Sequence, residues 1–90
     1  MRDTDNRALA RLGDATSHGG VIIEAALSLT DEGIRVALDG HLVVCPKCGG
    51  KYPIIASGRR RHEGLRIAHV GDITMCGATL LRIQPANSVA

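Results

Sequence analysis

The sequence predicts an all-β fold made of three quasi-repeated strand–turn–strand units. Its apolar segments are short, rich in Val, Ile and Leu, and bounded by Gly, Pro, Asp and Ser, which is typical of strands joined by turns. No segment combines a helical period of apolar residues with capping residues. Residues 5–12 could form a helical turn, but their match to two later strand segments favours extended structure.

The repeat is visible when the chain is aligned with itself. Residues 33–40 (GIRVALDG) match residues 64–71 (GLRIAHVG), and residues 9–13 (LARLG) fit the same frame. In each copy a glycine precedes a potential metal ligand by five positions: Gly13 and His18, Gly40 and Cys45, Gly71 and Cys76. We therefore treat the three glycines as equivalent positions, and likewise His18, Cys45 and Cys76.

Each unit is expected to run as a strand, a Gly-rich turn with a ligand-type residue, a returning strand and a hairpin loop. The returning strands are expected at residues 21–23, 53–55 and 79–81. The middle unit carries an insert, residues 46–52, within its turn. Hairpin loops are expected at residues 30–33 and 58–64, and residues 84–90 should form a short tail after the third unit.

The composition indicates one small domain that needs an additional source of stability beyond its core. The chain has 90 residues, one Tyr and no Trp or Phe, so its core must be built from Ile, Val, Leu and Ala. Domains of this size usually need a disulfide, a metal or a partner for stability. Three cysteines cannot all pair within one chain, and the polar start of the sequence (MRDTDN) has no signal-peptide h-region. Metal binding is therefore the better explanation for the closely spaced cysteines.

A structural zinc site follows from the repeat. If the units repeat in space, equivalent positions gather at one end, so His18, Cys45 and Cys76 converge and Cys48 lies beside Cys45. A Cys3His set is a regular tetrahedral site for structural Zn²⁺. The segment CPKCGG has the spacing of a zinc knuckle, in which both thiolates face one ion. His69, near the end of the strand leading to Cys76, is the alternative ligand. The zinc ion would pin the three turns of this small domain together.

Other functional interpretations of the Cys, Asp and His residues have less support in the sequence. A redox CxxC pair would need a surrounding βαβ pattern, which the sequence lacks. Asp14 and Asp72 could be paired carboxylates for acid–base chemistry, but an Asp after Gly more simply accepts backbone N–H bonds in a tight turn. His41 takes the same place in the middle copy, and we expect it and His62 to be solvated loop residues. No catalytic residue is predicted, and we expect the protein not to be an enzyme.

Three ordered motifs give the sequence a family resemblance. Residues 11–20 (RLGDATSHGG) look like the opening signature of the PAAR family. Residues 44–50 (VCPKCGG) and 71–80 (GDITMCGATL) resemble its middle and closing motifs. The match covers residues 8–83 of a single domain. Family sites often have histidine where Cys48 stands, so the resemblance leaves Cys48 and His69 open as the fourth ligand.

The resemblance implies a function. PAAR proteins are tip proteins of the bacterial type VI secretion system, in which a zinc-stabilised cone caps the trimeric VgrG spike. By this resemblance the chain is expected to be a monomer that binds a VgrG-like spike through its base, with a separate effector as a further candidate partner. It would assemble in the cytoplasm and leave the cell with the machine. The formal net charge of +2 and the absence of a membrane-length apolar run argue against nucleic-acid or stable membrane partners. The alternative is a zinc-knuckle adaptor that uses residues 59–61 (RRR) to bind nucleic acid or protein.

Overall fold

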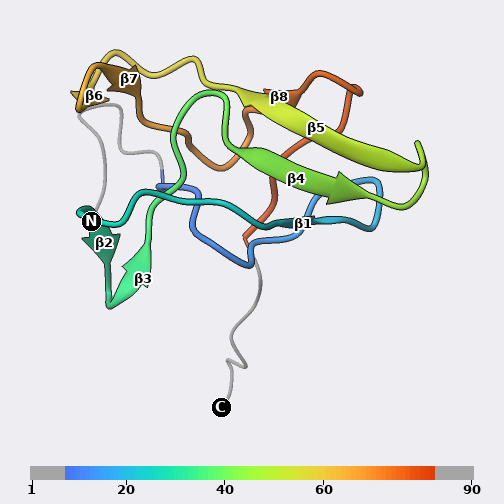
Figure 1. The fold of residues 1–90 in the computed structure, drawn as a ribbon, viewed down its shortest axis with the longest axis horizontal. Coiled ribbons are helices and arrows are strands. Elements are labelled where there is room, and N and C mark those ends of the chain that lie inside the picture. Colours follow the sequence, from blue (N-terminus) through green and yellow to red (C-terminus); the bar gives the residue numbers. More distant parts are fainter. Residues whose placement is uncertain (1–7, 83–90) are drawn as a thin grey trace.

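The computed structural model describes residues 8–82, and its fold is all-β as predicted (Figure 1). The strands are β1 (Val21–Ile22), β2 (Thr30–Asp31), β3 (Ile34–Arg35), β4 (Leu42–Cys45), β5 (Gly50–Ile55), β6 (Arg61–His62), β7 (Leu65–Arg66) and β8 (Ile73–Thr74). Among the described residues there is no helix with the length and apolar character needed to cross a membrane. The tail predicted at residues 84–90 and the start of the extended segment expected at 5–12 lie outside the described residues.

A curled antiparallel sheet joins the three units in the order β1-β4-β5-β8. The β4–β5 pair belongs to the middle unit, whereas the β1–β4 and β5–β8 pairs connect that unit to its two neighbours. An isolated bridge between Thr16 and Leu80 then connects the first unit to the third. It is supported by a backbone bond of 2.8 Å from Leu81 N to Ala15 O. Each unit therefore pairs with both of the others.

A ring of three backbone hydrogen bonds lies where the units meet. Ala10 N donates to Ala68 O at 3.0 Å, Ala68 N to Ala37 O at 3.0 Å, and Ala37 N to Ala10 O at 2.9 Å. These alanines occupy equivalent repeat positions, and all are fully buried. A second set of three backbone bonds starts from the residues two positions after these alanines. Leu12 N donates to Arg35 O, Asp39 N to Arg66 O, and Val70 N to Ala8 O. The three units therefore surround one approximate threefold axis.

The core is aliphatic, as the shortage of aromatic residues requires. The axial alanines pack with Ile22, Ile54 and Leu80, which occupy equivalent positions in the three units, and with Val43 and Ala56. Leu80 lies in an isolated bridge, so the strand expected at residues 79–81 is reduced to isolated bridges. A second cluster contains Leu9, Ala26, Val36, Leu38 and Ile67. Small residues at the axis allow the three backbones to approach within hydrogen-bonding distance, and the larger side chains fill the surrounding volume.

Two short hairpins lie at the end of the molecule that we call the base (Figure 1). β2 pairs with β3 and β6 with β7, and the central turn residues all have positive φ: Glu32 55°, Gly33 82°, Glu63 55° and Gly64 86°. Positive φ at both central positions is the conformation of type I′ hairpin turns. The loops predicted at residues 30–33 and 58–64 are therefore too long, because β2 and β6 continue into them.

The residue after each repeat glycine caps the preceding turn. Asp14 Oδ2 accepts a hydrogen bond from Arg11 N at 2.8 Å, and Asp72 Oδ2 accepts one from His69 N at 2.9 Å. In the middle unit, His41 Nδ1 accepts the equivalent bond from Leu38 N at 3.0 Å. The turn interpretation of the two aspartates is confirmed. The expectation that His41 is merely solvated is wrong, since its ring replaces a capping carboxylate.

Replacing His41 by alanine is expected to lower the free energy of unfolding by about 1 kcal/mol, because the N–H of Leu38 loses its acceptor. His41→Asp should keep wild-type stability, since it introduces the side chain that the other two units use. Urea unfolding of both variants measures the difference. Equal stability of His41→Ala and wild type would show that the ring does not cap the turn.

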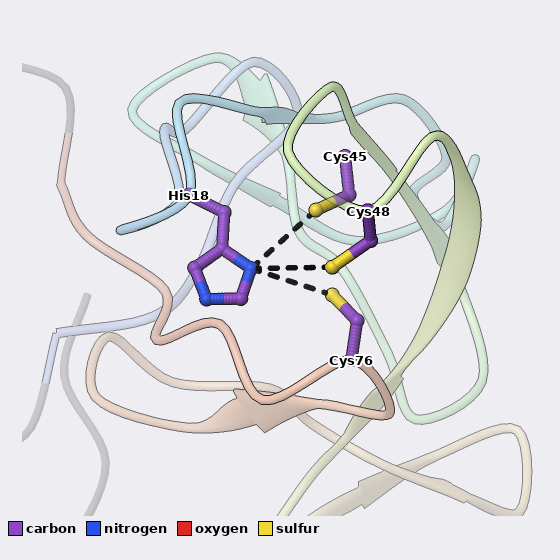
Figure 2. A group of neighbouring side chains, drawn as sticks. All are labelled: His18, Cys45, Cys48 and Cys76. Atoms are coloured by element: carbon purple, nitrogen blue, oxygen red, sulfur yellow. Dashed lines mark hydrogen bonds between the residues drawn. The ribbon is translucent and has the colours of Figure 1, made fainter.

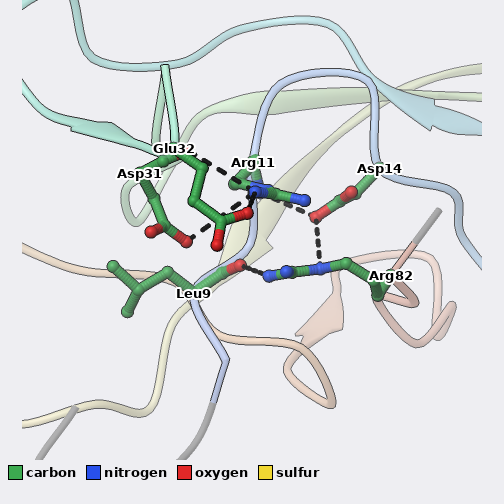
Figure 3. A network of polar contacts seen from close by, with 6 residues as sticks. All are labelled: Leu9, Arg11, Asp14, Asp31, Glu32 and Arg82. Atoms are coloured by element: carbon green, nitrogen blue, oxygen red, sulfur yellow. Dashed lines mark hydrogen bonds and ion pairs between the residues drawn. The ribbon is translucent and has the colours of Figure 1, made fainter. Parts of the chain in front are cut away.

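A network of charged side chains ties the first unit to the base (Figure 3). Arg11 is almost fully buried, and its Nη1 lies 3.2 Å from Glu32 Oε1 and 3.9 Å from Asp31 Oδ2. Arg82 Nε lies 3.9 Å from the buried carboxylate of Asp14. Buried charges require such partners, because an isolated charge in the interior is strongly unfavourable.

Candidate metal centre

Three turns bring the four predicted ligand residues together at the end opposite the base, which we call the apex (Figures 1 and 2). The potential ligand atoms of His18, Cys45, Cys48 and Cys76 all lie within 4.8 Å of one another. His18 Nδ1 is 3.4 Å from the Sγ of Cys45, 3.7 Å from that of Cys48 and 3.8 Å from that of Cys76. Each repeat unit thus contributes to one cluster.

The spacing of these atoms fits a tetrahedral metal site. Zinc binds thiolate sulfur at about 2.3 Å and imidazole nitrogen at about 2.0–2.1 Å, so a tetrahedral centre separates nitrogen from sulfur by roughly 3.6 Å. The observed nitrogen–sulfur distances of 3.4–3.8 Å bracket that value. The cluster could therefore hold a metal ion with all four positions filled by protein atoms.

The middle turn is a knuckle between β4 and β5 that carries Cys45 and Cys48. Cys45 ends β4, and Gly49 N donates to Cys45 O at 2.8 Å, which closes the turn. Gly49 has a φ of 80°, a conformation that side chains with a Cβ rarely adopt. Tyr52 Oη donates to the backbone oxygen of Cys48 at 3.2 Å and fixes the outer part of the knuckle.

The other two turns share a different construction. Gly19 N donates to Thr16 O at 3.0 Å, and Gly77 N donates to Thr74 O at 2.9 Å. In each turn the threonine hydroxyl also accepts a backbone N–H that follows the ligand, from Gly20 at 3.1 Å and from Ala78 at 3.2 Å. These bonds hold His18 and Cys76 in short turns that need no inserted residues.

The three cysteines are free thiols in distinct environments. Cys45 is buried, Cys76 is half-buried and Cys48 is exposed. The Thr74 hydrogen bond is the main cause that lowers the pKa of Cys76 to about 6, with a further contribution from Ala78 N. The neighbouring Cys45 thiol raises the pKa of Cys48 to about 11. The hydrogen bonds at Cys76 therefore favour the thiolate, the form in which cysteine binds metals.

His69, the alternative ligand, lies outside this group of four. It is fully buried, pairs with Leu9 in an isolated bridge, and its ring lies against Gly58. A Cβ on Gly58 would come within 2.4 Å of the ring carbon Cε1, so the glycine leaves room for the imidazole. His69 thus has a place in the interior and not at the apex.

The sequence reasoning missed Thr16 and Thr74. Their signal was present, because each stands two positions before a ligand in the two units that lack an insert. Val43 occupies the equivalent position in the unit that has the knuckle. The same register that identified the ligands could have identified these hydroxyls.

Comparison with known proteins agrees with the fold and the cluster. No curated protein matches the chain. A family model described as the PAAR motif matches residues 12–82, which contain all four residues of the cluster and the three units except the start of the first. This family is a structural family of secretion-system spike tips. With that match over most of its length, the chain belongs to the PAAR-domain family.

Proposed function

We propose that this protein is the tip of a type VI secretion spike. Its base would cap the end of a trimeric VgrG-type protein, and its apex would hold a structural zinc ion through His18, Cys45, Cys48 and Cys76. The observation that carries the proposal is the ring of backbone bonds through Ala10, Ala37 and Ala68, which gives a single chain approximate threefold symmetry.

Symmetry is what lets one chain fit a trimer. A trimer presents three equivalent surfaces around its axis. A partner with three similar faces can contact all of them at once, whereas an asymmetric monomer would leave some unpaired. The second set of bonds, which includes Asp39 to Arg66 at 2.8 Å, extends the threefold pattern beyond the alanine ring.

The base has features suited to docking. Leu27 is 85% exposed, and the β3 and β7 residues Ile34 and Leu65 are 39% and 43% exposed. The β2–β3 and β6–β7 hairpins are each two-stranded. Exposed strand edges and apolar side chains are suited to β-augmentation by a partner. The end of a trimeric β-structured partner would supply matching strand edges and apolar side chains.

A zinc ion suits the donor set at the apex. Thiolate and imidazole ligands favour zinc over the harder cations that prefer oxygen. When bound, the ion would cross-link three turns that are distant in sequence, and four protein ligands leave no open position for a substrate. We therefore propose a structural metal and no enzymatic activity, with assembly in the cytoplasm and export on the spike. A separate effector chain remains a candidate cargo.

Retention on a co-expressed, tagged trimeric spike protein tests the docking. Ile34→Asp and Leu65→Asp should each reduce retention at least tenfold, because a charge would be buried against the partner. Lys47→Asp, an exposed change at the apex, is the matched control and should be retained like wild type. Equal retention of all variants, or loss only with Lys47→Asp, would show that the base is not the docking surface.

A further inference from the structure

We propose that Thr74 positions Cys76 as a metal ligand by donating its hydroxyl hydrogen to the cysteine sulfur. The inference rests on the proposed metal site at the apex, and it assigns a role to a residue that is not itself a ligand. Thr74 is a positioning residue, because it acts only through Cys76.

The direction of this bond follows from the proposed metal ligation of Cys76. Thr74 Oγ1 lies 3.1 Å from Cys76 Sγ and accepts the N–H of Ala78 at 3.2 Å. Thr74 is 1% exposed, so water does not compete for its hydroxyl. A ligand thiolate carries no proton, and therefore only the threonine can donate between these two atoms.

The repeat supplies an internal comparison. Thr16 occupies the equivalent position in the first unit, where its hydroxyl accepts N–H groups from Gly20 at 3.1 Å and His18 at 3.3 Å. Its ligand is a histidine, so there is no sulfur for it to contact. Val43 occupies the third equivalent position and is fully buried. Turn closure is thus common to both threonines, whereas the bond to sulfur belongs to Thr74 alone.

A hydrogen bond to the sulfur should matter because three thiolates crowd one ion. Sharing the sulfur charge with a donor reduces repulsion among the thiolates and holds the side chain in its ligating rotamer. Residues that support metal ligands in this way typically contribute about 10–100-fold to metal affinity.

Three variants separate the sulfur bond from turn closure. Thr74→Val removes the hydroxyl but keeps the side-chain volume, and the presence of Val43 in the third unit shows that valine fits this kind of position. Thr16→Val makes the same change in the histidine turn. Thr74→Ser keeps the hydroxyl. Zinc affinity is measured by competition with a chromogenic chelator, and the sulfur-to-cobalt charge-transfer band is recorded for each Co²⁺-loaded protein.

Thr74→Val should bind zinc about 10–100-fold more weakly and shift the cobalt band to lower energy, since an unbonded thiolate is a stronger donor. Thr16→Val should lose less affinity and leave the band in place, and Thr74→Ser should resemble wild type. If Thr74→Val does not fold, Thr74→Ala provides the same comparison.

Two results would overturn the inference: an unchanged affinity and band in Thr74→Val, or an equal loss in Thr16→Val. Either result would leave the proposed metal site intact if wild type shows the thiolate–cobalt band. Absence of that band in wild type would instead contradict the metal site itself.

Discussion

Replacing Cys76 by alanine is expected to abolish stoichiometric metal binding and to unfold most of the protein at 37 °C. The free energy of binding a structural zinc ion, about 10–16 kcal/mol in small domains, is also folding free energy. A domain of this size has a total stability of roughly 5–13 kcal/mol. Losing one of the four ligands should therefore lower the free energy of zinc binding by more than the total stability of the domain. Metal content of the purified variant and its thermal unfolding curve measure the effect.

The neighbouring residue provides the control for this change. Met75 is 64% exposed, and Met75→Ala alters the same turn without touching the cluster. It should keep one metal ion per chain and a wild-type melting temperature. Treating wild type with a strong chelator should reproduce the unfolding of Cys76→Ala, whereas the variant should respond little to the chelator. Wild-type stability and metal content in Cys76→Ala would refute the structural role of the cluster.

Replacing Leu80 by alanine is expected to lower the free energy of unfolding by about 2–5 kcal/mol. Leu80 is fully buried and packs against the axial alanines together with Ile22 and Ile54. The substitution removes apolar contacts and leaves a cavity at the point where the three units meet. Denaturant unfolding of the metal-loaded protein gives the change in stability.

The next residue in the chain is the matched control. Leu81 is 42% exposed and points away from this core. Leu81→Ala should therefore cost less than about 1 kcal/mol, because the removed surface is already in contact with water. Similar losses in the two variants would show that the core is not centred on the threefold axis.

The repeat made most of the fold predictable. The five-residue step from glycine to ligand placed His18, Cys45 and Cys76 at equivalent positions, and the structure brings their ligand atoms together. The same register carries the backbone ring through Ala10, Ala37 and Ala68. Because equivalent residues in a closed repeat must lie around one axis, sequence spacing was enough to predict which distant turns would meet.

The details that escaped prediction depend on local geometry. The type I′ turns at Glu32 and Glu63 place a non-glycine residue at positive φ, which composition alone does not signal. Likewise, the capping role of His41 depends on one imidazole nitrogen reaching Leu38 N. The residue type permits this contact but does not require it.

Whether Cys48 or His69 joins the cluster could be decided only from the three-dimensional structure. His69 is close to Cys76 in sequence, but it belongs to the segment after β7 that passes through the interior, where it contacts Gly58. Cys48 is carried outward by the knuckle, to within 3.7 Å of His18 Nδ1. Sequence separation therefore gave no guide to which side chain reaches the apex.

X-ray absorption at the zinc K-edge of the purified wild-type protein tests most directly whether one ion joins the three turns. One zinc per chain is expected, with three sulfur neighbours at about 2.3 Å and one nitrogen neighbour at about 2.0–2.1 Å. Absence of stoichiometric metal, or a first shell of nitrogen and oxygen without the three sulfurs, would contradict a metal-pinned apex built from His18, Cys45, Cys48 and Cys76.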